Sequence, residues 1–153
     1  MTLQTKDFEA KPPEELLCWS MDQYGDKVGL ASSFGMEDMV LIDMIAKLKG
    51  SLTIFTLDTG RLHEETYELM DRVHSKYGLE IKTYFPDRDK IENLVREKGF
   101  FSFRESVENR KECCYIRKVE PLNRALGELK AWITGLRRSQ GVTRTDIPKV
   151  LED

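Results

Sequence analysis

The chain has 153 residues, of which 40% are hydrophobic and 33% are charged, and its formal net charge is −3. This length suits one domain with its own core, and the composition is that of an ordinary soluble protein. No apolar run of about 20 residues predicts a membrane span, and the slightly negative charge argues against a protein that coats nucleic acid. The N-terminus lacks the apolar stretch of a secretory signal. Three cysteines, an odd number, favour a reducing cytoplasm over a disulfide scaffold.

Hydrophobic periodicity predicts helices and strands in alternation. The expected elements are a helix from Pro12–Pro13 to about Gly25, a strand over 28–32, a helix over 36–48, a strand over 52–57, a helix over 63–77, a strand over 80–85, a helix capped by Pro86–Asp87 and running to about 98, a helix over about 109–126 that Pro121 kinks or splits, and a strand over 131–134. Short apolar strands separated by helices predict an α/β fold, with a parallel sheet covered by helices on both faces. We expect residues 1–153 to form a single domain.

The turn after the first predicted strand is a candidate anion site. It consists of Ser32, Ser33, Phe34 and Gly35. In an open parallel sheet the carboxyl ends of the strands form the ligand crevice, and a helix N-terminus there offers unpaired N–H groups to phosphate or sulfate. The serines add hydroxyl donors, and the glycine allows close approach of the backbone. The loop lacks the Gly-Lys-Ser/Thr of a Walker A motif, which disfavours a P-loop NTPase.

The turn after the second predicted strand allows two interpretations. It consists of Leu57, Asp58, Thr59, Gly60 and Arg61. In the first, Asp58 hydrogen-bonds a ribose and Arg61 meets an anion. In the second, Asp58 or Thr59 caps the next helix and Gly60 is only a turn residue. The two interpretations are compatible, and the sequence leaves both open.

Basic residues gather in the last third of the chain. Residues 104–144 contain ten Lys and Arg against five Glu, whereas the rest of the chain is acidic. This asymmetry indicates either a local anion site or a solvated, salt-bridged helix. Anion binding is favoured by the loop after the last strand, which contains Gly135, Arg137, Arg138 and Arg144. A guanidinium group can donate two parallel hydrogen bonds to the oxygens of phosphate or sulfate.

Cys113 and Cys114 are adjacent and have cationic neighbours. Adjacent cysteines are poorly placed to form a disulfide with each other, so the pair could be iron–sulfur ligands, redox thiols or core residues. A complete cluster site needs four thiolates, and the third cysteine, Cys18, is expected to be a buried, inert side chain. His63 and His74 lack the spacing of a helical zinc site.

Taken together, these motifs resemble the adenylyl-sulfate (APS) and 3′-phosphoadenylyl-sulfate (PAPS) reductases of assimilatory sulfate reduction, which serve cysteine biosynthesis. The matching pieces are Ser32-Ser33-Phe34-Gly35, Leu57-Asp58-Thr59-Gly60-Arg61 with Glu65-Thr66-Tyr67, Cys113-Cys114 with Arg117-Lys118-Val119 and Pro121-Leu122, and Gly135-Leu136-Arg137-Arg138-Ser139-Gln140 with Arg144. The resemblance implies the adenine-nucleotide α-hydrolase-like (PP-loop) fold.

The resemblance also implies roles for these residues. The nucleotide loop would be Ser32, Ser33, Phe34 and Gly35, and the adenosine pocket would be lined by Leu57, Asp58, Thr59 and Gly60. The phosphosulfate would face Lys118, Arg137, Arg138 and Arg144, on the loop that begins at Gly135. Cys113 and Cys114 would be two of the four ligands of a [4Fe–4S] cluster, and such a tandem pair favours APS over PAPS.

In the family's chemistry an enzyme thiolate attacks the sulfate sulfur, AMP leaves, and thioredoxin or glutaredoxin releases sulfite. The family's second cysteine pair and its nucleophilic cysteine do not occur in these 153 residues, and we expect them beyond Asp153. The chain by itself would then lack catalytic activity. No nucleic acid or membrane partner is expected, and a homo-oligomer is left open. The alternatives are a PP-loop ATP-pyrophosphatase or adenylyltransferase, and a non-catalytic nucleotide-binding module.

Overall fold

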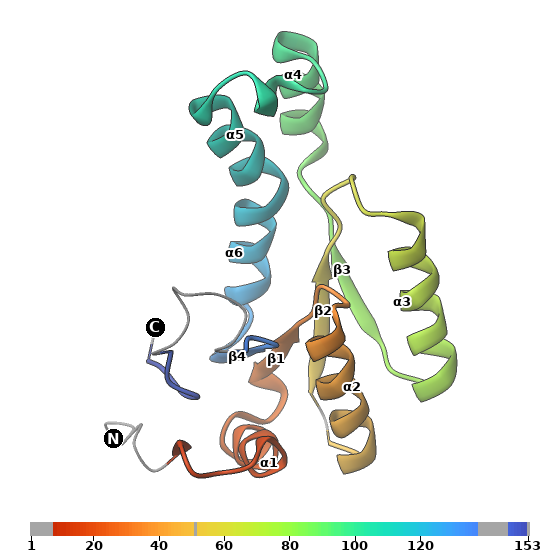
Figure 1. The fold of residues 1–153 in the computed structure, drawn as a ribbon, viewed down its shortest axis with the longest axis vertical. Helices are drawn as coiled ribbons and strands as arrows, with labels where there is room; N and C mark the ends of the chain where they lie inside the picture. The colour runs from red at the N-terminus through yellow and green to blue at the C-terminus, as the bar shows by residue number, and fades with distance from the viewer. Residues whose placement is uncertain (1–7, 51, 138–146, 153) are drawn as a thin grey trace.

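Four parallel strands form one sheet in the order β3-β2-β1-β4 (Figure 1). A computed structural model describes residues 8–50, 52–137 and 147–152. Its strands are β1 (Val28–Ala31), β2 (Thr53–Leu57), β3 (Ile81–Tyr84) and β4 (Ala131–Thr134). Leu30 at the centre of β1 lies between Ile54 of β2 and Ile133 of β4. The chain therefore builds the sheet outward from β1 to β3 and returns to the other side of β1 with β4.

Helices cover both faces of this sheet. They are α1 (Pro13–Tyr24), α2 (Met36–Leu48), α3 (Glu64–Tyr77), α4 (Arg88–Lys98), α5 (Val107–Cys114) and α6 (Glu120–Leu126), with short 3₁₀ turns η2 (Gly25–Lys27) and η3 (Ser102–Arg104) and a π-helical turn η4 (Tyr115–Val119). Figure 1 shows α2 and α3 on one side of the sheet and α6, which contacts β2 and β3, on the other. The predicted fold class is thus confirmed.

The core lies between the central strands and the helices on the α2–α3 side. Its buried members include Leu30, Ile42, Ile54 and Val73, all at most 2% exposed. β1 and the middle of β2 are buried on both faces, whereas β3 and β4 at the sheet edges are partly exposed. A strand with neighbours on both sides and helices on both faces needs an apolar run, which is what the sequence shows at β1.

The helix expected over about 109–126 is interrupted in a specific way. It begins earlier, at Val107, where Ser106 Oγ accepts a hydrogen bond from Asn109 N at 3.0 Å. η4 then widens the backbone just before Pro121, which has no N–H to donate to the preceding turn. The expected interruption is therefore present, as a π-helical turn that keeps α5, η4 and α6 in one run.

Two other helix ends follow the sequence signals. Asp87 caps α4 by accepting from Lys90 N at 3.0 Å, and Gly99 closes it by donating to Val95 O at 2.8 Å. Within residues 8–50, 52–137 and 147–152, no helix combines the length and apolar character needed to span a bilayer.

Candidate functional site

The loop between β1 and α2 is held by its own side chains. Ser32 N donates to Phe55 O at 2.9 Å, which continues the β1–β2 ladder. Ser32 Oγ accepts from Phe34 N at 3.1 Å. Phe34 has φ of +60°, a left-handed conformation that is costly for a residue with a Cβ. Burial of the Phe34 ring in the core offsets this cost and fixes the path of the loop.

Asp38 in the first turn of α2 holds Ser33. Its Oδ2 accepts from Ser33 N at 2.6 Å and from Ser33 Oγ at 2.9 Å. Asp38 is only 5% exposed, and its two hydrogen bonds with Ser33 help to compensate for the burial of its carboxylate. Ser33 was expected to offer its hydroxyl to an anion, and here that hydroxyl already has an acceptor. Asp38 was not among the predicted site residues.

The N-terminus of α2 faces the same loop. Gly35 is its N-cap residue and has no side chain that could cap the first amides of the helix. A Cβ at Gly35 would make only ordinary contacts, with Ser33 Oγ at 3.6 Å and Glu37 Oε2 at 3.7 Å. These contacts therefore do not by themselves require glycine here, and the first amides of α2 can donate to an anion.

The loop after β2 is organised by Asp58, which is 6% exposed. Its amide donates to Tyr84 O at 3.0 Å, which extends the β2–β3 pairing. Its Oδ1 accepts from Gly60 N at 2.7 Å, and its Oδ2 accepts from Tyr67 OH at 2.9 Å. That hydrogen bond, aided by burial and by the negative charge of Asp58, raises the pKa of Tyr67. The alternative that Asp58 or Thr59 caps the next helix is wrong, because α3 begins at Glu64 with His63 as its N-cap residue.

A buried arginine joins this loop to the helix of the tandem cysteines. Arg117 Nη1 donates to Thr59 O at 2.7 Å across 58 positions of sequence. Its neighbour Lys118 is exposed. One turn earlier, Cys113 is buried and Cys114 is exposed. The fold therefore brings the helix of the cysteine pair next to the Asp58 loop.

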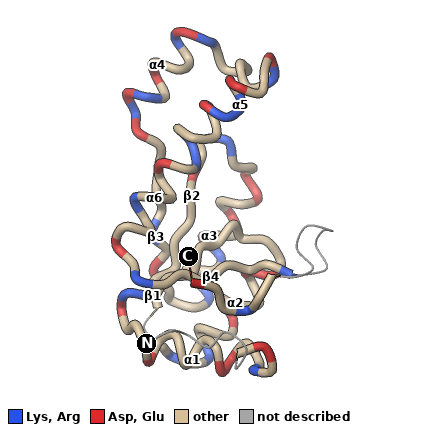
Figure 2. The backbone as a smooth tube through the Cα atoms, turned by 90° about the vertical axis from the view of Figure 1, so that its left-hand side faces the viewer, with Lys and Arg blue, Asp and Glu red and all other residues tan. Residues whose placement is uncertain are grey.

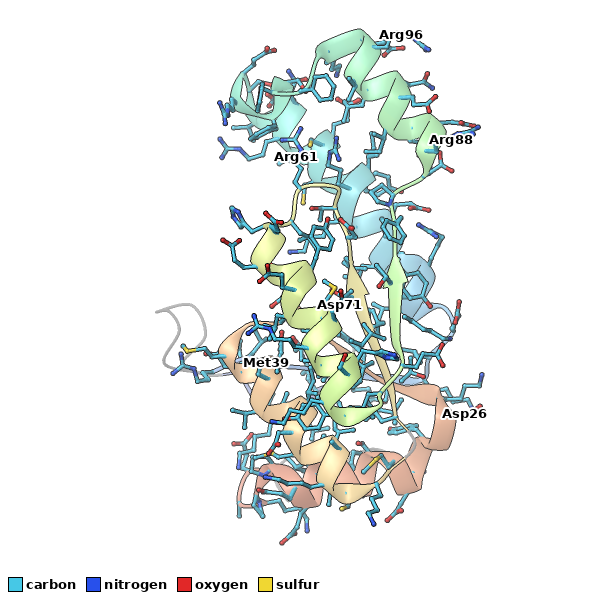
Figure 3. The ribbon with its side chains drawn as sticks, turned by 90° about the vertical axis from the view of Figure 1, so that its right-hand side faces the viewer. Asp26, Met39, Arg61, Asp71, Arg88 and Arg96 are labelled. Atoms are coloured by element: carbon cyan, nitrogen blue, oxygen red, sulfur yellow. The ribbon has the colours of Figure 1, made fainter. Side chains whose placement is uncertain are left out.

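Arg61 was expected to meet an anion, but its guanidinium contacts the segment after α4 instead. Its Nη2 donates to Phe100 O, and its guanidinium lies 4.5 Å from the centre of the Phe103 ring. Through the hydrogen bond to Phe100 O, Arg61, labelled in Figure 3, ties the loop after β2 to the segment after α4. Its described contacts are structural.

The end of β4 packs against the start of α2. A Cβ at Gly135 would overlap Asp38 Oδ1 and lie 3.1 Å from Asp38 N. Beyond it, Arg137 Nε lies 2.5 Å from Glu37 Oε1. The predicted anion ligand Arg137 is thus beside the expected loop and paired with a carboxylate. Arg138 and Arg144 lie outside the described residues.

These loops share the carboxyl edge of the sheet, because β1, β2 and β4 are parallel neighbours. Two cavities of the described residues lie elsewhere. One, of about 490 Å³, is an open groove lined by α1, α2 and α3, and the other, of about 180 Å³, lies between the sheet and α6. The site is therefore defined by convergent polar groups on adjacent loops rather than by either of these cavities.

Charges of both signs alternate along α4, α5 and α6 (Figure 2). Lys98 Nζ lies 2.6 Å from Glu112, and Arg124 Nε lies 3.1 Å from Glu120. The salt-bridged interpretation of the basic segment is thus correct for these helix faces. Lys118, which follows Arg117 in the sequence, is also exposed.

The sequence profile of the phosphoadenosine phosphosulfate reductase domain matches residues 27–153. The chain belongs to this family. The expected resemblance is confirmed, and all the motifs described above fall within the matched range.

Named relatives agree with this assignment. The chain is 50% identical to an adenosine 5′-phosphosulfate reductase of Burkholderia cepacia, over 99% of this chain and 61% of that protein. It is 44% identical to the chloroplastic 5′-adenylylsulfate reductase 1 of Arabidopsis thaliana, over 97% of this chain and 31% of that protein. The chain thus spans less than two thirds of the length of these relatives.

A solved structure shares the fold of this family member. It is a phosphoadenylyl-sulfate (PAPS) reductase from Candida auris in a phosphate complex, 27% identical, with a TM-score of 0.76. The similarity covers 90% of this chain and 67% of that one.

The cysteine pair fits a metal only in part. Two adjacent thiols at a helix end are suitable soft ligands, but in the described part of the chain no group of three or more His, Cys, Asp or Glu side chains could hold a metal ion. A four-ligand cluster therefore needs further donors. Cys18 is half-buried on α1.

Sequence reasoning missed the residues that hold the loops, namely Asp38, Tyr67 and Arg117. Tyr67 and Arg117 stand within the recognised motifs, but nothing local in the sequence tells which backbone or carboxylate they reach. A polar residue at the third position of α2 was the available signal for Asp38.

Proposed function

We propose that this chain forms the nucleotide-binding portion of a reductase that converts adenylyl sulfate to sulfite and AMP. In this proposal, residues 1–153 form one sulfonucleotide-binding domain. The observation that carries it is the 2.7 Å hydrogen bond from Arg117 to Thr59 O, because it joins the helix of Cys113 and Cys114 to the Asp58 loop. Neither motif alone distinguishes a reductase from other nucleotide-binding proteins.

The adenosine part would bind along residues 57–60. Each oxygen of the Asp58 carboxylate accepts one hydrogen bond from the chain. A carboxylate oxygen can accept two, so Asp58 retains capacity for ribose hydroxyls. The amides at the start of α2, with Ser32, Ser33, Phe34 and Gly35, would receive the phosphate.

The phosphosulfate would lie between Lys118 and the arginines Arg137, Arg138 and Arg144. The reaction brings a thiolate to a dianionic substrate, so cationic groups are needed to stabilise the negative charge. Arg137 would exchange its partner Glu37 for the substrate. Arg138 and Arg144, in the same loop, would also stabilise the negative charge of the substrate.

In the proposed chemistry, a thiolate attacks the sulfate sulfur and forms an S–S bond. The S–O bond to the phosphate breaks, and AMP leaves with its electron pair. A donor thiolate then attacks the enzyme sulfur, and sulfite leaves with the electrons of the S–S bond. Two thiols are oxidised to a disulfide while sulfur(VI) becomes sulfur(IV). The nucleophilic thiol is not among the groups assigned to this chain.

Adenylyl sulfate is the favoured substrate, rather than its 3′-phosphorylated form. The two relatives at 50% and 44% identity are named for adenylyl sulfate, and the structure at 27% identity is named for PAPS. The tandem pair Cys113–Cys114 supports the same choice.

We further propose that Cys113 and Cys114 supply two ligands of a [4Fe–4S] cluster, which when bound would tune the electrostatics beside the substrate. Thioredoxin or glutaredoxin would be the thiol donor, in the cytoplasm. A Cys113→Ser variant, in a polypeptide with the full ligand set, should lose the iron absorbance, and retention of that absorbance would refute the ligand role.

Titration calorimetry with AMP and with adenylyl sulfate tests the substrate assignment. Lys118→Ala should weaken adenylyl sulfate binding about tenfold or more, because it removes a charge-assisted hydrogen bond. Lys111→Ala is the matched control, since Lys111 is an exposed lysine on α5 about two turns away.

Equal losses in the two variants would contradict the assignment of Lys118. Turnover of ATP with magnesium to pyrophosphate would instead support the ATP-pyrophosphatase alternative. The third possibility is a non-catalytic nucleotide-binding module. It would be supported if the longest natural polypeptide that contains this sequence bound AMP tightly but did not convert adenylyl sulfate.

A further inference from the structure

Arg117 is a charged residue on the buried face of the α5–η4–α6 run. It is 8% exposed, and within the described residues its guanidinium donates from Nη1 to Thr59 O at 2.7 Å. Its Nε is buried with no hydrogen-bond partner in the part of the chain that the structure describes. Burying a guanidinium is costly unless good partners compensate.

The loop that receives Arg117 is adapted to it. Gly60 has φ of +71°, where a side chain is strained. A Cβ at Gly60 would also lie 3.2 Å from Arg117 Nη1. The glycine therefore serves two purposes, because it allows the turn after Asp58 and leaves room for the guanidinium.

The helix that presents Arg117 also presents a thiol on the same side. Cys113, Arg117, Pro121 and Ala125 are the buried positions of the α5–η4–α6 run, one about every turn. The π-helical turn contains Arg117 at its centre. Such turns are frequent at functional sites, because the extra residue changes where side chains point.

We propose that Arg117 is a positioning residue that fixes the Thr59–Gly60 backbone to the helix face of Cys113. The nucleotide loop and the cysteine pair then keep one relative geometry. Arg117 acts through the loop backbone and need not touch the substrate. This inference rests on the proposed function, because the loop matters only if it receives the nucleotide.

Two measurements on the 153-residue chain test it. The first is hydrogen exchange of the Gly60 amide, which donates to Asp58 Oδ1, and it needs no ligand. The second is the dissociation constant for AMP by calorimetry. Arg117→Met removes the donor at similar length, and Arg110→Met is the matched control on an exposed arginine of α5.

Arg117→Met should speed Gly60 exchange and raise the AMP dissociation constant, each about tenfold, which corresponds to the loss of one hydrogen bond from a charged donor. Arg110→Met should leave both unchanged. A lower melting temperature with unchanged exchange and unchanged affinity would overturn the proposal, since it would mark Arg117 as structural only.

If Arg117→Met fails to fold, Arg117→Lys carries the test. An ammonium group lacks the planar fork of the guanidinium, so both quantities should rise by less than tenfold, and wild-type values for both would overturn the proposal. If the unsubstituted chain does not bind AMP, the proposed function fails. The exchange data would still decide the loop-holding role, because faster Gly60 exchange supports it and unchanged exchange overturns it.

Discussion

Single residues at this site are held by partners on the helices that follow them. Ser33 is held by Asp38, five positions later, and Asp58 by Tyr67, nine positions later. The sequence identified Ser33 and Asp58 as polar groups at strand ends. It could not identify their partners, because a hydroxyl or carboxylate on the next helix can point toward the loop or toward solvent with the same local sequence.

The Asp58–Tyr67 hydrogen bond predicts a pH-dependent effect. The bond raises the pKa of Tyr67 above its usual value near 10. Its contribution to stability is therefore fully present below about pH 10 and is lost as the pH rises through the higher folded-state pKa. Tyr67→Phe should lower the midpoint of urea unfolding at pH 7.

Urea titrations at pH 7 and above pH 11 check this prediction, with Tyr115→Phe as the control, because Tyr115 is 52% exposed. The gap between Tyr67→Phe and the unsubstituted chain should narrow at the higher pH. A gap of constant size across this range would contradict the account.

At the scale of elements, local periodicity determined most boundaries. α2 and β4 begin and end at the residues expected from the sequence, Met36–Leu48 and Ala131–Thr134. The region around Pro121 was recognised as a break but not as a π-helical turn. Proline disrupts a regular helix at this point, but the packing around it determines whether the helix kinks, breaks or forms a wider turn.

The contact between β4 and α2 predicts the effect of a single methyl group. Gly135→Ala would push its Cβ against Asp38, whose carboxylate and amide both lie next to Gly135. Asp38 is buried and bonded to Ser33, so it cannot move freely. We expect a loss of about 1–3 kcal/mol in the free energy of unfolding and faster exchange of the Ser33 amide.

Gly127→Ala is the control, because Gly127 has helical φ and ψ of −61° and −18° and its nearest contact would be at 3.3 Å. Its effect should stay within about 1 kcal/mol. Chemical denaturation followed by circular dichroism measures both variants. Equal stability of the Gly135→Ala variant and the unsubstituted chain would show that β4 does not constrain the Ser33 loop.

At the scale of the whole molecule, the parallel sheet places the loops after β1, β2 and β4 at one edge. α1, which carries Cys18, leads into the opposite end of β1, and α5 lies far from it in Figure 1. Of the three thiols, Cys18 thus lies on a distant helix, and Cys113 and Cys114 are the proposed metal ligands. The proposed reduction would need a further free thiol near the substrate.

We therefore expect the purified 153-residue chain to release no sulfite from adenylyl sulfate in the presence of thioredoxin. A sulfite assay with a complete reductase as the positive control makes the measurement. Release of sulfite by this chain would mean that Cys113, Cys114 or Cys18 serves as the nucleophile, and the metal-ligand proposal would fall if Cys113→Ser or Cys114→Ser stopped it.

The sequence by itself determined the elements, the parallel sheet and the edge where the polar loops gather. It could do so because periodicity and turn chemistry are local, and because parallel strands separated by helices leave few topologies. Only the tertiary structure decided that Arg117 reaches Thr59, that Asp38 holds Ser33 and that Arg61 turns toward Phe103. Those contacts depend on how helices dock on the sheet, and docking is set by the packing of the whole core rather than by any short stretch of chain.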